Sequence, residues 1–589
     1  MYLLQRVSIG IIMMSIVFSM LPNAYGFESS LDTQEAVKEI ERKQMETERK
    51  LREKEQQEKS RQSITEPEAE HGEESVKFMI KEIVLENDQL LGWFEERDLI
   101  KPYINREISM NDINTLMIKI TNTLIHKGYI TTRVKIPLGQ NLKSGKLVLH
   151  ILIGFVEEIT PEPNTLRKQM QVFNAFPFLV HKPLDINDLD YGIEQMNKVR
   201  SGNATIKIEP GNEMGGSKII VTNDARNPAS LDIGMDNLGQ KETGLYREKA
   251  TFSLDNIASL NDTFFVDYVG SLVDDAHRKK STCYTVSYSF PLGYWTLGLM
   301  YSHSDYLRYI EGLNTEFAAS GNTTSLIPTL DRIIWRDKFD RIKFKSSLAI
   351  ENQQNYIQDA LVDTSSKKLT VGKVGLEYSG FVFGGFSSIS VMYDKGLNIL
   401  NAYTDPSSLS SDTPRAQFDK YEISATWNKD VMVYSQKFGF LFSGNGQYAE
   451  KTLYNSEQLC IGDMNTVRGF RGGAAAGDRG YYLRTDVSAS DFSRFWDYLK
   501  GVRLFVGYDV GYVRASSSVH ANYGEGEAYL SGWSTGFNYY TNIVNINVTY
   551  SRKIYATPYV KSNSQEVYVV ATTSVTGIGE AGYIYLFSK

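Results

Sequence analysis

The run Cys283-Tyr-Thr-Val-Ser-Tyr-Ser-Phe290 alternates between a small or polar residue and a bulky apolar one. Successive side chains of a β-strand point to opposite faces, so the run predicts a strand with one polar and one apolar face. Residues 295–302 and 544–551 repeat the pattern. Helical periodicity is lacking and such alternation prevails from about residue 228 to residue 589, which makes β-structure the predicted fold of this region.

Two architectures share this alternation, a soluble β-sandwich and a membrane barrel whose outer face contacts lipid. Three features favour the barrel. The strands run for about nine residues or more, as a tilted crossing of the bilayer requires. Aromatic residues crowd the apolar faces of these strands and their ends, as interfacial girdles do, and no domain break interrupts the region. The sequence therefore predicts a transmembrane β-barrel over residues 224–589.

The N-terminus has the features of an export signal. Arg6 provides a positive charge, residues 7–20 are almost entirely apolar, and Ala24-Tyr25-Gly26 places small residues where a signal peptidase cleaves. We predict that residues 1–26 are a cleaved secretory signal. No later run reaches the roughly 18 consecutive apolar residues of a membrane-spanning helix.

A charged segment, residues 27–62, follows the signal. Asp32 and Glu35 have the spacing of a helix cap, and pairs such as Glu39 and Lys43 are four residues apart. The segment should be helical, but its apolar stripe fades after Met45. It is either a helix suited to a polar cavity or a solvated tether. Residues 63–75, which are polar and acidic, read as a linker.

Residues 76–153 and 154–223 read as two copies of one small α/β module. In the first, a strand over 78–85 precedes a helix that Ser109 can cap, and two alternating strands follow. The second repeats this order, with Asp185 as the cap of its long helix. The expected order in each module is strand, two helices and two strands.

Composition excludes several functions. The net charge of -7 gives no basic surface for nucleic acid, so no nucleic-acid partner is predicted. The two cysteines, Cys283 and Cys460, are far apart and are expected to stay unpaired. No metalloprotease or serine-hydrolase motif occurs, and Gly145-Lys146 is followed by Leu147 where a phosphate loop needs Ser or Thr. We therefore predict no enzyme activity, no metal and no cofactor.

A glycine-rich stretch, residues 461–481, interrupts the barrel and is too polar to face lipid. It must be a loop, and we call it the signature loop. Its two motifs are Val467-Arg468-Gly469-Phe470 and Gly477-Asp478-Arg479-Gly480. Together they resemble the signature loop of the two-partner-secretion transporters, the outer-membrane haemolysin and haemagglutinin exporters of the Omp85 superfamily.

The resemblance extends over nearly the whole mature chain. It identifies 76–153 and 154–223 as two POTRA domains and 27–62 as a plug helix, ahead of a barrel that in this family has sixteen antiparallel strands. It implies that the signature loop folds back into the barrel, where Arg468 contacts an aspartate on a neighbouring strand. The matching residue here is Asp509. Two departures are Phe470, where many relatives have Tyr, and the ending Phe587-Ser-Lys589 in place of a terminal aromatic residue.

The resemblance also implies a function. The POTRA domains, in the periplasm of a Gram-negative bacterium, would bind an unfolded exoprotein, an adhesin or cytolysin with an N-terminal secretion domain. The barrel, set in outer-membrane lipid by the barrel-assembly machinery, would secrete it, and in haemolysin-type members activate it as well. A passive porin is one alternative, but it needs neither the modules nor the loop. An assembly factor of the same superfamily is the other, although such factors usually carry more POTRA domains.

Overall fold

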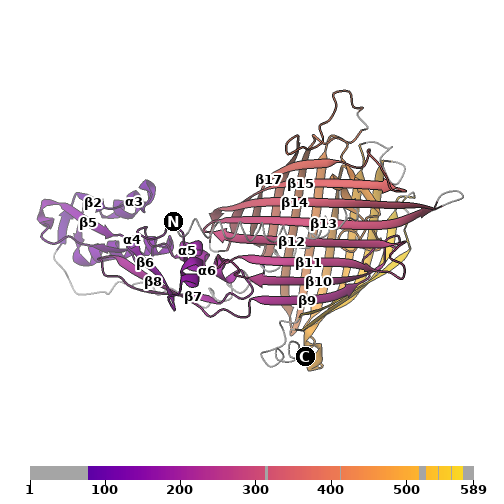
Figure 1. The fold of residues 1–589 in the computed structure, drawn as a ribbon. Coiled ribbons are helices and arrows are strands. Elements are labelled where there is room, and N and C mark those ends of the chain that lie inside the picture. Colours follow the sequence, from indigo (N-terminus) through magenta and orange to yellow (C-terminus); the bar gives the residue numbers. More distant parts are fainter. Residues whose placement is uncertain are drawn as a thin grey trace.

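A computed structural model describes residues 77–574, apart from 312–315, 338, 411–412, 517–525, 542, 559 and 561, together with Arg49. The predicted signal, the charged segment and the linker, residues 1–75, lie outside the described residues except for Arg49, as do residues 575–589. Figure 1 shows a barrel with an arm of small mixed sheets and helices attached at one of its ends.

Sixteen antiparallel strands form the closed barrel, in which each strand pairs with the next along the chain and β27 pairs with β9. A two-residue strand, β16 (Ala360–Leu361), extends one hairpin. This confirms the predicted fold class. The strands are β9 (Ala229–Asp236), β10 (Tyr246–Asp255), β11 (Thr263–Leu272), β12 (Lys280–Leu292), β13 (Trp295–Glu311), β14 (Glu316–Arg336), β15 (Arg341–Ile357), β17 (Lys368–Val382), β18 (Gly385–Leu397), β19 (Asp419–Val433), β20 (Gln436–Ala449), β23 (Arg479–Ser490), β24 (Val502–Arg514), β25 (Glu527–Tyr540), β26 (Val544–Ala556) and β27 (Gln565–Ser574).

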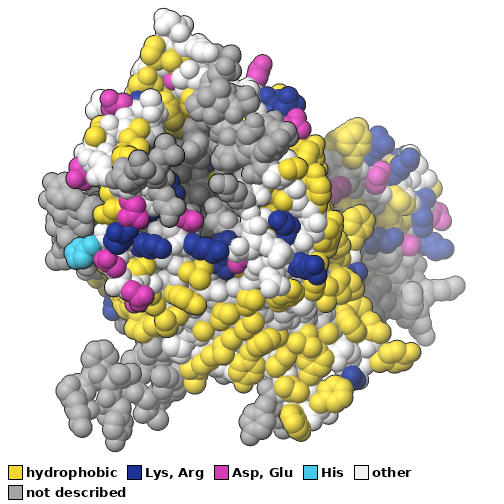
Figure 2. Space-filling model, turned by 90° about the vertical axis from the view of Figure 1, so that its right-hand side faces the viewer, with side chains coloured by type: hydrophobic (Ala, Val, Ile, Leu, Met, Phe, Trp, Pro, Cys, Tyr) yellow, Lys and Arg dark blue, Asp and Glu magenta, His cyan; other side chains and the backbone are white. Residues whose placement is uncertain are grey.

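Alternation along β24 shows how the sequence separates the two faces of the wall. Leu504, Val506 and Tyr508 are exposed on the outer face, whereas Phe505 and Asp509 are buried on the inner face. Figure 2 shows hydrophobic side chains gathered on the outer wall, with charged side chains around the end that faces the viewer. An apolar outside and a polar inside are what a barrel in lipid requires.

The first α/β module has nine elements. They are β1 (Lys77–Ile80), β2 (Glu82–Glu86), α3 (Trp93–Ile100), η1 (Lys101–Tyr103), β3 (Arg106–Ser109), α4 (Met110–His126), β4 (Arg133–Lys135), η2 (Leu142–Ser144) and β5 (Lys146–Leu152). The predicted strand over 78–85 is split at Lys81, whose N–H donates to the carbonyl of Gly145 (2.7 Å). As a result β1 pairs with β3, while β2 joins the sheet β2-β5-β4.

Ser109 caps α4 as predicted. Its Oγ accepts from the Asp112 N–H (3.1 Å), and an Asp112 carboxylate oxygen accepts from the Ser109 N–H (2.7 Å). The Ser109 N–H and then the Ser109 hydroxyl, which donates to the same carboxylate (2.8 Å), hold the pKa of Asp112 below its usual value. The buried face of α4, which includes Ile113, Leu116 and Ile120, packs on the sheet and forms the core of the module.

The second α/β module contains β6 (Phe155–Glu162), α5 (Leu166–Ala175), α6 (Ile186–Asn197), β7 (Ala204–Pro210) and β8 (Gly216–Asn223). Its sheet order, β6-β8-β7, matches β2-β5-β4 of the first module, with a parallel and an antiparallel pair in each. Asp185 caps α6 by accepting from the Asn187 N–H (2.8 Å). Among the described residues, no helix is long and apolar enough to span a membrane.

Helix α5 joins the second module to two turns of the barrel. The carbonyl of Asn174 accepts from the N–H of Gly293, between β12 and β13 (2.9 Å). The carbonyl of Gln171 accepts from the side-chain amide of Asn261, between β10 and β11 (2.8 Å). The module therefore contacts the ends of four consecutive strands.

Helix α6 adds a buried ionic contact at a third turn, between β14 and β15. The Glu194 carboxylate lies 2.6 Å from Arg341 Nη1 and 3.2 Å from Arg336 Nη2, and the three side chains are at most 8% exposed. Tyr191 stacks on Tyr294 with ring centroids 4.5 Å apart. This end of the arm is thus fixed to the barrel at three successive turns.

We expect Glu194→Ala to loosen this junction. Breaking a buried pair by removing one partner typically costs about 3–5 kcal/mol, and here Arg336 and Arg341 would both lose their carboxylate. Limited proteolysis should then separate arm from barrel faster. Glu209→Ala is the matched control, because Glu209 pairs with Lys207 on the surface, where an ion pair contributes about 0–1 kcal/mol. Equal cleavage rates for the two variants would contradict this role of Glu194.

Candidate functional site

The signature loop lies inside the barrel, where it forms a short hairpin. Before it, η3 (Asn455–Glu457) leads into β21 (Leu459–Ile461), which pairs with β22 (Ala475–Gly477) before the chain enters β23. The sequence predicted only a loop here. Apolar side chains fix the hairpin to the inner wall at β24 and β25. This cluster consists of Leu459, Ile461, Val467, Phe470, Ala475, Val513, Ala528, Leu530 and Val560.

Arg468 contacts two carboxylates of the wall. Its Nε and Nη2 each lie 2.7 Å from an oxygen of Asp509, a bidentate pair, and its backbone N–H donates to the same carboxylate (3.0 Å). Nη2 also donates to Asp486 Oδ1 (2.6 Å). The Arg468 and Asp509 side chains are 1% and 0% exposed. The structure thus brings together Arg468 and the aspartate named from the sequence, and adds Asp486.

Two glycines of the wall make room for Arg468. A Cβ on Gly507 would lie 2.4 Å from Arg468 Nη2 and 2.2 Å from the Asp486 carboxylate. A Cβ on Gly532 would lie 2.0 Å from the Arg468 carbonyl oxygen. Since real Cβ atoms do not approach so closely, glycine at both positions is a condition for seating the arginine. Phe505 closes the site, with its ring centroid 5.7 Å from the guanidinium carbon.

The residues beside Arg468 hold the loop against the last strands. Val467 and Phe470 are fully buried. The Tyr568 hydroxyl, on β27, donates to the Phe470 carbonyl and accepts from the Gly469 N–H (3.3 Å). Phe470 is therefore an apolar anchor, and its main chain supplies the polar contact.

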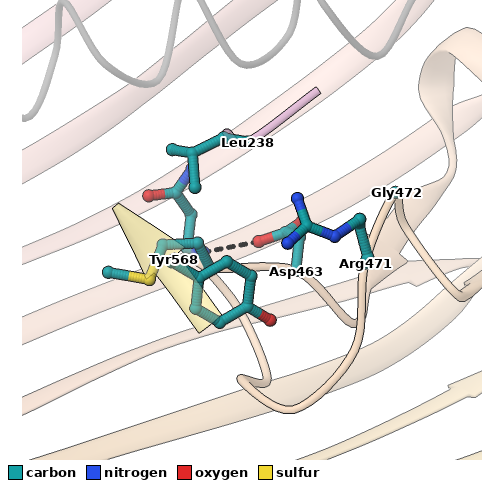
Figure 3. Close-up of a pocket in the computed structure, with 7 residues that line it drawn as sticks. Leu238, Asp463, Arg471, Gly472 and Tyr568 are labelled. Atoms are coloured by element: carbon teal, nitrogen blue, oxygen red, sulfur yellow. Dashed lines mark hydrogen bonds between the residues drawn. The ribbon is translucent and has the colours of Figure 1, made fainter. Parts of the chain in front are cut away.

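The tip of the loop borders a small pocket, shown in Figure 3. Arg471 lies across this pocket from Leu238 and pairs with Glu566, at 2.9 Å between Nη2 and Oε2. The Asp463 carboxylate accepts from the Asn465 N–H (2.6 Å), which closes the turn at the tip. The tip is thus bound to β27 by Arg471 and shaped by Asp463.

Asp478 ties the two ends of the loop together. One carboxylate oxygen accepts from the Leu453 N–H (2.8 Å) and from Gln458 Nε2 (3.0 Å), and the other accepts from the Ser516 N–H (2.5 Å). The side chain is fully buried. Gly477 packs on the backbone of Arg514, where a Cβ would lie 2.7 Å from the nitrogen. Asp478 therefore joins the end of the loop to the segment that precedes it and to the end of β24.

The last two residues of the second motif begin β23. Arg479 Nη2 donates to Ser516 Oγ (3.3 Å), and its guanidinium carbon lies 5.5 Å from the Tyr448 ring centroid. Gly480 pairs with Val513 of β24. These two residues therefore hold the C-terminal end of the loop, residues 477–480, which we call its root.

Sequence reasoning missed two features of this site. Asp486 had a usable signal, since it alternates with the outward-facing Val487 on the strand after the loop. Lys420, which binds Glu457 just ahead of β21 (2.7 Å), had none, because the two residues are 37 positions apart. Cys283 on β12 and Cys460 on β21 are both buried, and they form no disulfide with each other.

Family models match most of the described chain. Residues 78–154 match a ShlB-type POTRA domain, residues 155–210 a further POTRA domain, and residues 215–539 the haemolysin secretion/activation protein ShlB/FhaC/HecB. A barrel with a POTRA arm and a lumenal loop defines the protein as an outer-membrane transporter of the two-partner-secretion type. More particularly, the chain belongs to the ShlB/FhaC/HecB family.

Curated relatives of this chain are transporters of the same class. The outer membrane transporter CdiB of Dickeya dadantii is 32% identical over 411 residues, 70% of this chain and 72% of the relative. The hemolysin transporter protein ShlB of Serratia marcescens is 30% identical over 383 residues, 65% and 67%. Among solved structures, CdiB from Escherichia coli superposes with a TM-score of 0.78 at 25% identity, and covers 94% of this chain and 100% of its own.

These findings confirm the predicted class and location. The chain is an outer-membrane translocator of an exoprotein, with periplasmic POTRA domains. Its family consists of transporters.

Proposed function

We propose that this transporter captures an unfolded exoprotein on its POTRA arm and passes it through the barrel when the signature loop leaves its resting place. The observation that carries the proposal is the buried contact of Arg468 with Asp509 and Asp486. A charged group fixed inside a polar channel needs partners of opposite sign, and such a contact can be exchanged for water as the loop moves.

The arm offers strand edges for capture. In the sheets β2-β5-β4 and β6-β8-β7, the outer strands have one neighbour within their own sheet. An extended exoprotein segment can add to such an edge through main-chain hydrogen bonds. Folding of the exoprotein outside the cell supplies a direction without nucleotide hydrolysis, because a folded chain does not return through the channel.

Lipid and the assembly machinery complete the proposed set of partners. Outer-membrane lipid covers the apolar face exemplified by Leu504 and Val506. The barrel-assembly machinery inserts the chain. The activity of the exoprotein, adhesin or cytolysin, is part of the proposal and rests on the family alone.

The test is to compare the proteins that wild-type and deletion strains release into the culture medium. We expect one large exoprotein to disappear when this chain is absent and to return when it is supplied from a plasmid. An unchanged medium, together with a loss of several unrelated barrels from the outer membrane, would point to an assembly factor instead.

Residues 27–62 lie outside the described residues, and we propose from their sequence that they plug the pore at rest. A charged, weakly amphipathic helix suits a polar channel better than an apolar groove. Deleting 27–62 should give larger or more frequent single-channel openings in planar bilayers. Unchanged conductance would favour the solvated tether.

A further inference from the structure

The stem that leads into the signature loop, residues 453–459, has an ionic contact of its own, apart from those of Arg468 and of Arg471 in the loop. Glu457, in η3, places a carboxylate oxygen 2.7 Å from Lys420 Nζ on β19. The two side chains are 9% and 3% exposed. The contact therefore lies in the interior of the barrel and joins the stem to β19, which β20 separates from the strands that bind Arg468.

Lys420 has two further carboxylates within reach, both on the wall. Glu422, on the same strand, lies 2.8 Å from Nζ, and Asp394, on β18, lies 3.4 Å away. Lys373 of β17 pairs with Asp394 from the other side (3.2 Å). Of the three carboxylates around Lys420, only Glu457 belongs to the stem.

Gln447 of β20 connects the stem to the root of the loop. Its Nε2 lies 3.0 Å from the carbonyl oxygen of Glu457 and 3.3 Å from that of Asp478. Since Asp478 also binds Leu453 and Gln458 of the stem, the stem and the root are held as one body. A displacement of Glu457 is thus transmitted to both ends of the loop.

The Arg468 contact and the Glu457 contact differ in which charges remain buried after each contact opens. If Arg468 departs, Asp509 and Asp486 lose the guanidinium group that both of them contact. Their two negative charges, at close range, then repel each other. If Glu457 departs, Lys420 keeps Glu422 and Asp394, and the freed carboxylate enters water. Opening at the stem therefore strands no buried charge.

We propose that Glu457 and Lys420 are positioning residues that form a second lock on the signature loop, and that this lock opens before the Arg468 lock. The inference rests on the proposed function, because it assumes that the loop moves during transport. In this arrangement Lys420 holds the stem at rest, and its other two carboxylates leave it paired when the stem departs.

Cys460 is a native reporter for the stem. It lies on β21, three residues after Glu457, and is buried. In a Cys283→Ser background it is the only thiol of the chain. Its labelling by a small charged thiosulfonate reagent, in isolated outer membranes, measures how often the stem leaves the wall.

We expect Glu457→Ala to raise the Cys460 labelling rate about tenfold or more, because reactivity of a buried group follows the population of the open state. Glu422→Ala is the matched control, since it removes a carboxylate from the same ammonium group without touching the loop, and should leave the rate near that of the parent. Arg468→Ala should raise it less than Glu457→Ala.

Equal rates for Glu457→Ala and Glu422→Ala would overturn the second lock, and a larger effect of Arg468→Ala would overturn the order of opening. Heat-modifiable migration of the barrel verifies that each variant is folded, and Lys420→Met tests the lock from the wall side if Glu457→Ala is not inserted. The labelling rates test the lock, whereas the comparison of culture media tests the proposed function, so the two can fail separately.

Discussion

Arg468→Ala should reduce secretion to background while a correctly inserted barrel remains. The substitution leaves Asp509 and Asp486 on neighbouring strands of the inner wall without the arginine that both contact. The loss is about 3–5 kcal/mol for a fully buried pair and smaller where channel water reaches the carboxylates. This is enough to move the loop but not to open the barrel, because the strand hydrogen bonds hold the wall independently.

A double-mutant cycle measures the pairing directly. Asp509→Ala should be less damaging than Arg468→Ala, because Arg468 keeps Asp486. Adding Asp509→Ala to Arg468→Ala should cost much less than Asp509→Ala costs alone. Arg494→Ala, at an exposed arginine, controls for loss of a positive charge. Secretion and heat-modifiable migration are the measurements, and additive losses would mean that the two residues act separately.

Deleting residues 76–223 should leave a folded barrel and stop secretion. The barrel closes through its own strands, from β9 to β27, so the arm is not needed for closure. Arg336 and Arg341 would lose Glu194 but gain solvent. Secretion depends on capture, and the strand edges proposed for it would be gone.

The measurement is the amount of exoprotein in the medium, with heat-modifiable migration and surface protease protection as tests of folding. Deleting only 76–153 is the matched control, because it keeps the docked second module and tests whether one module suffices for capture. Normal release from the longer deletion would refute a receptor role for the arm.

The barrel could be predicted from sequence because each strand carries its own signal. Alternation such as Tyr284, Val286 and Tyr288 against small residues is local and survives any error in strand pairing. The helix caps were equally local, since Ser109 and Asp185 precede their helices directly. Features that depend only on residues close together in the sequence can be predicted without knowing which distant residues they contact.

Features set by distant contacts were not predictable. The first of the two alternating strands expected after the Ser109-capped helix is only three residues long, Arg133–Lys135, because the Thr132 N–H bonds to the Tyr129 carbonyl (3.1 Å) and turns the chain. Asp509 was named only through family resemblance. Lys420 and Glu457 meet only after the barrel closes and the loop enters it, so neither residue carries a local signal of the contact.

The junction between arm and barrel has a mechanical consequence. A domain attached at one point can rotate about that point. The second POTRA domain is attached at three successive turns, through Gln171, Asn174 and Glu194. Three contacts spread along the rim oppose both tilting and rotation of the domain relative to the barrel. A chain caught on this domain is therefore delivered to the pore mouth from one fixed side, and tension on it is borne by the rim between β10 and β15.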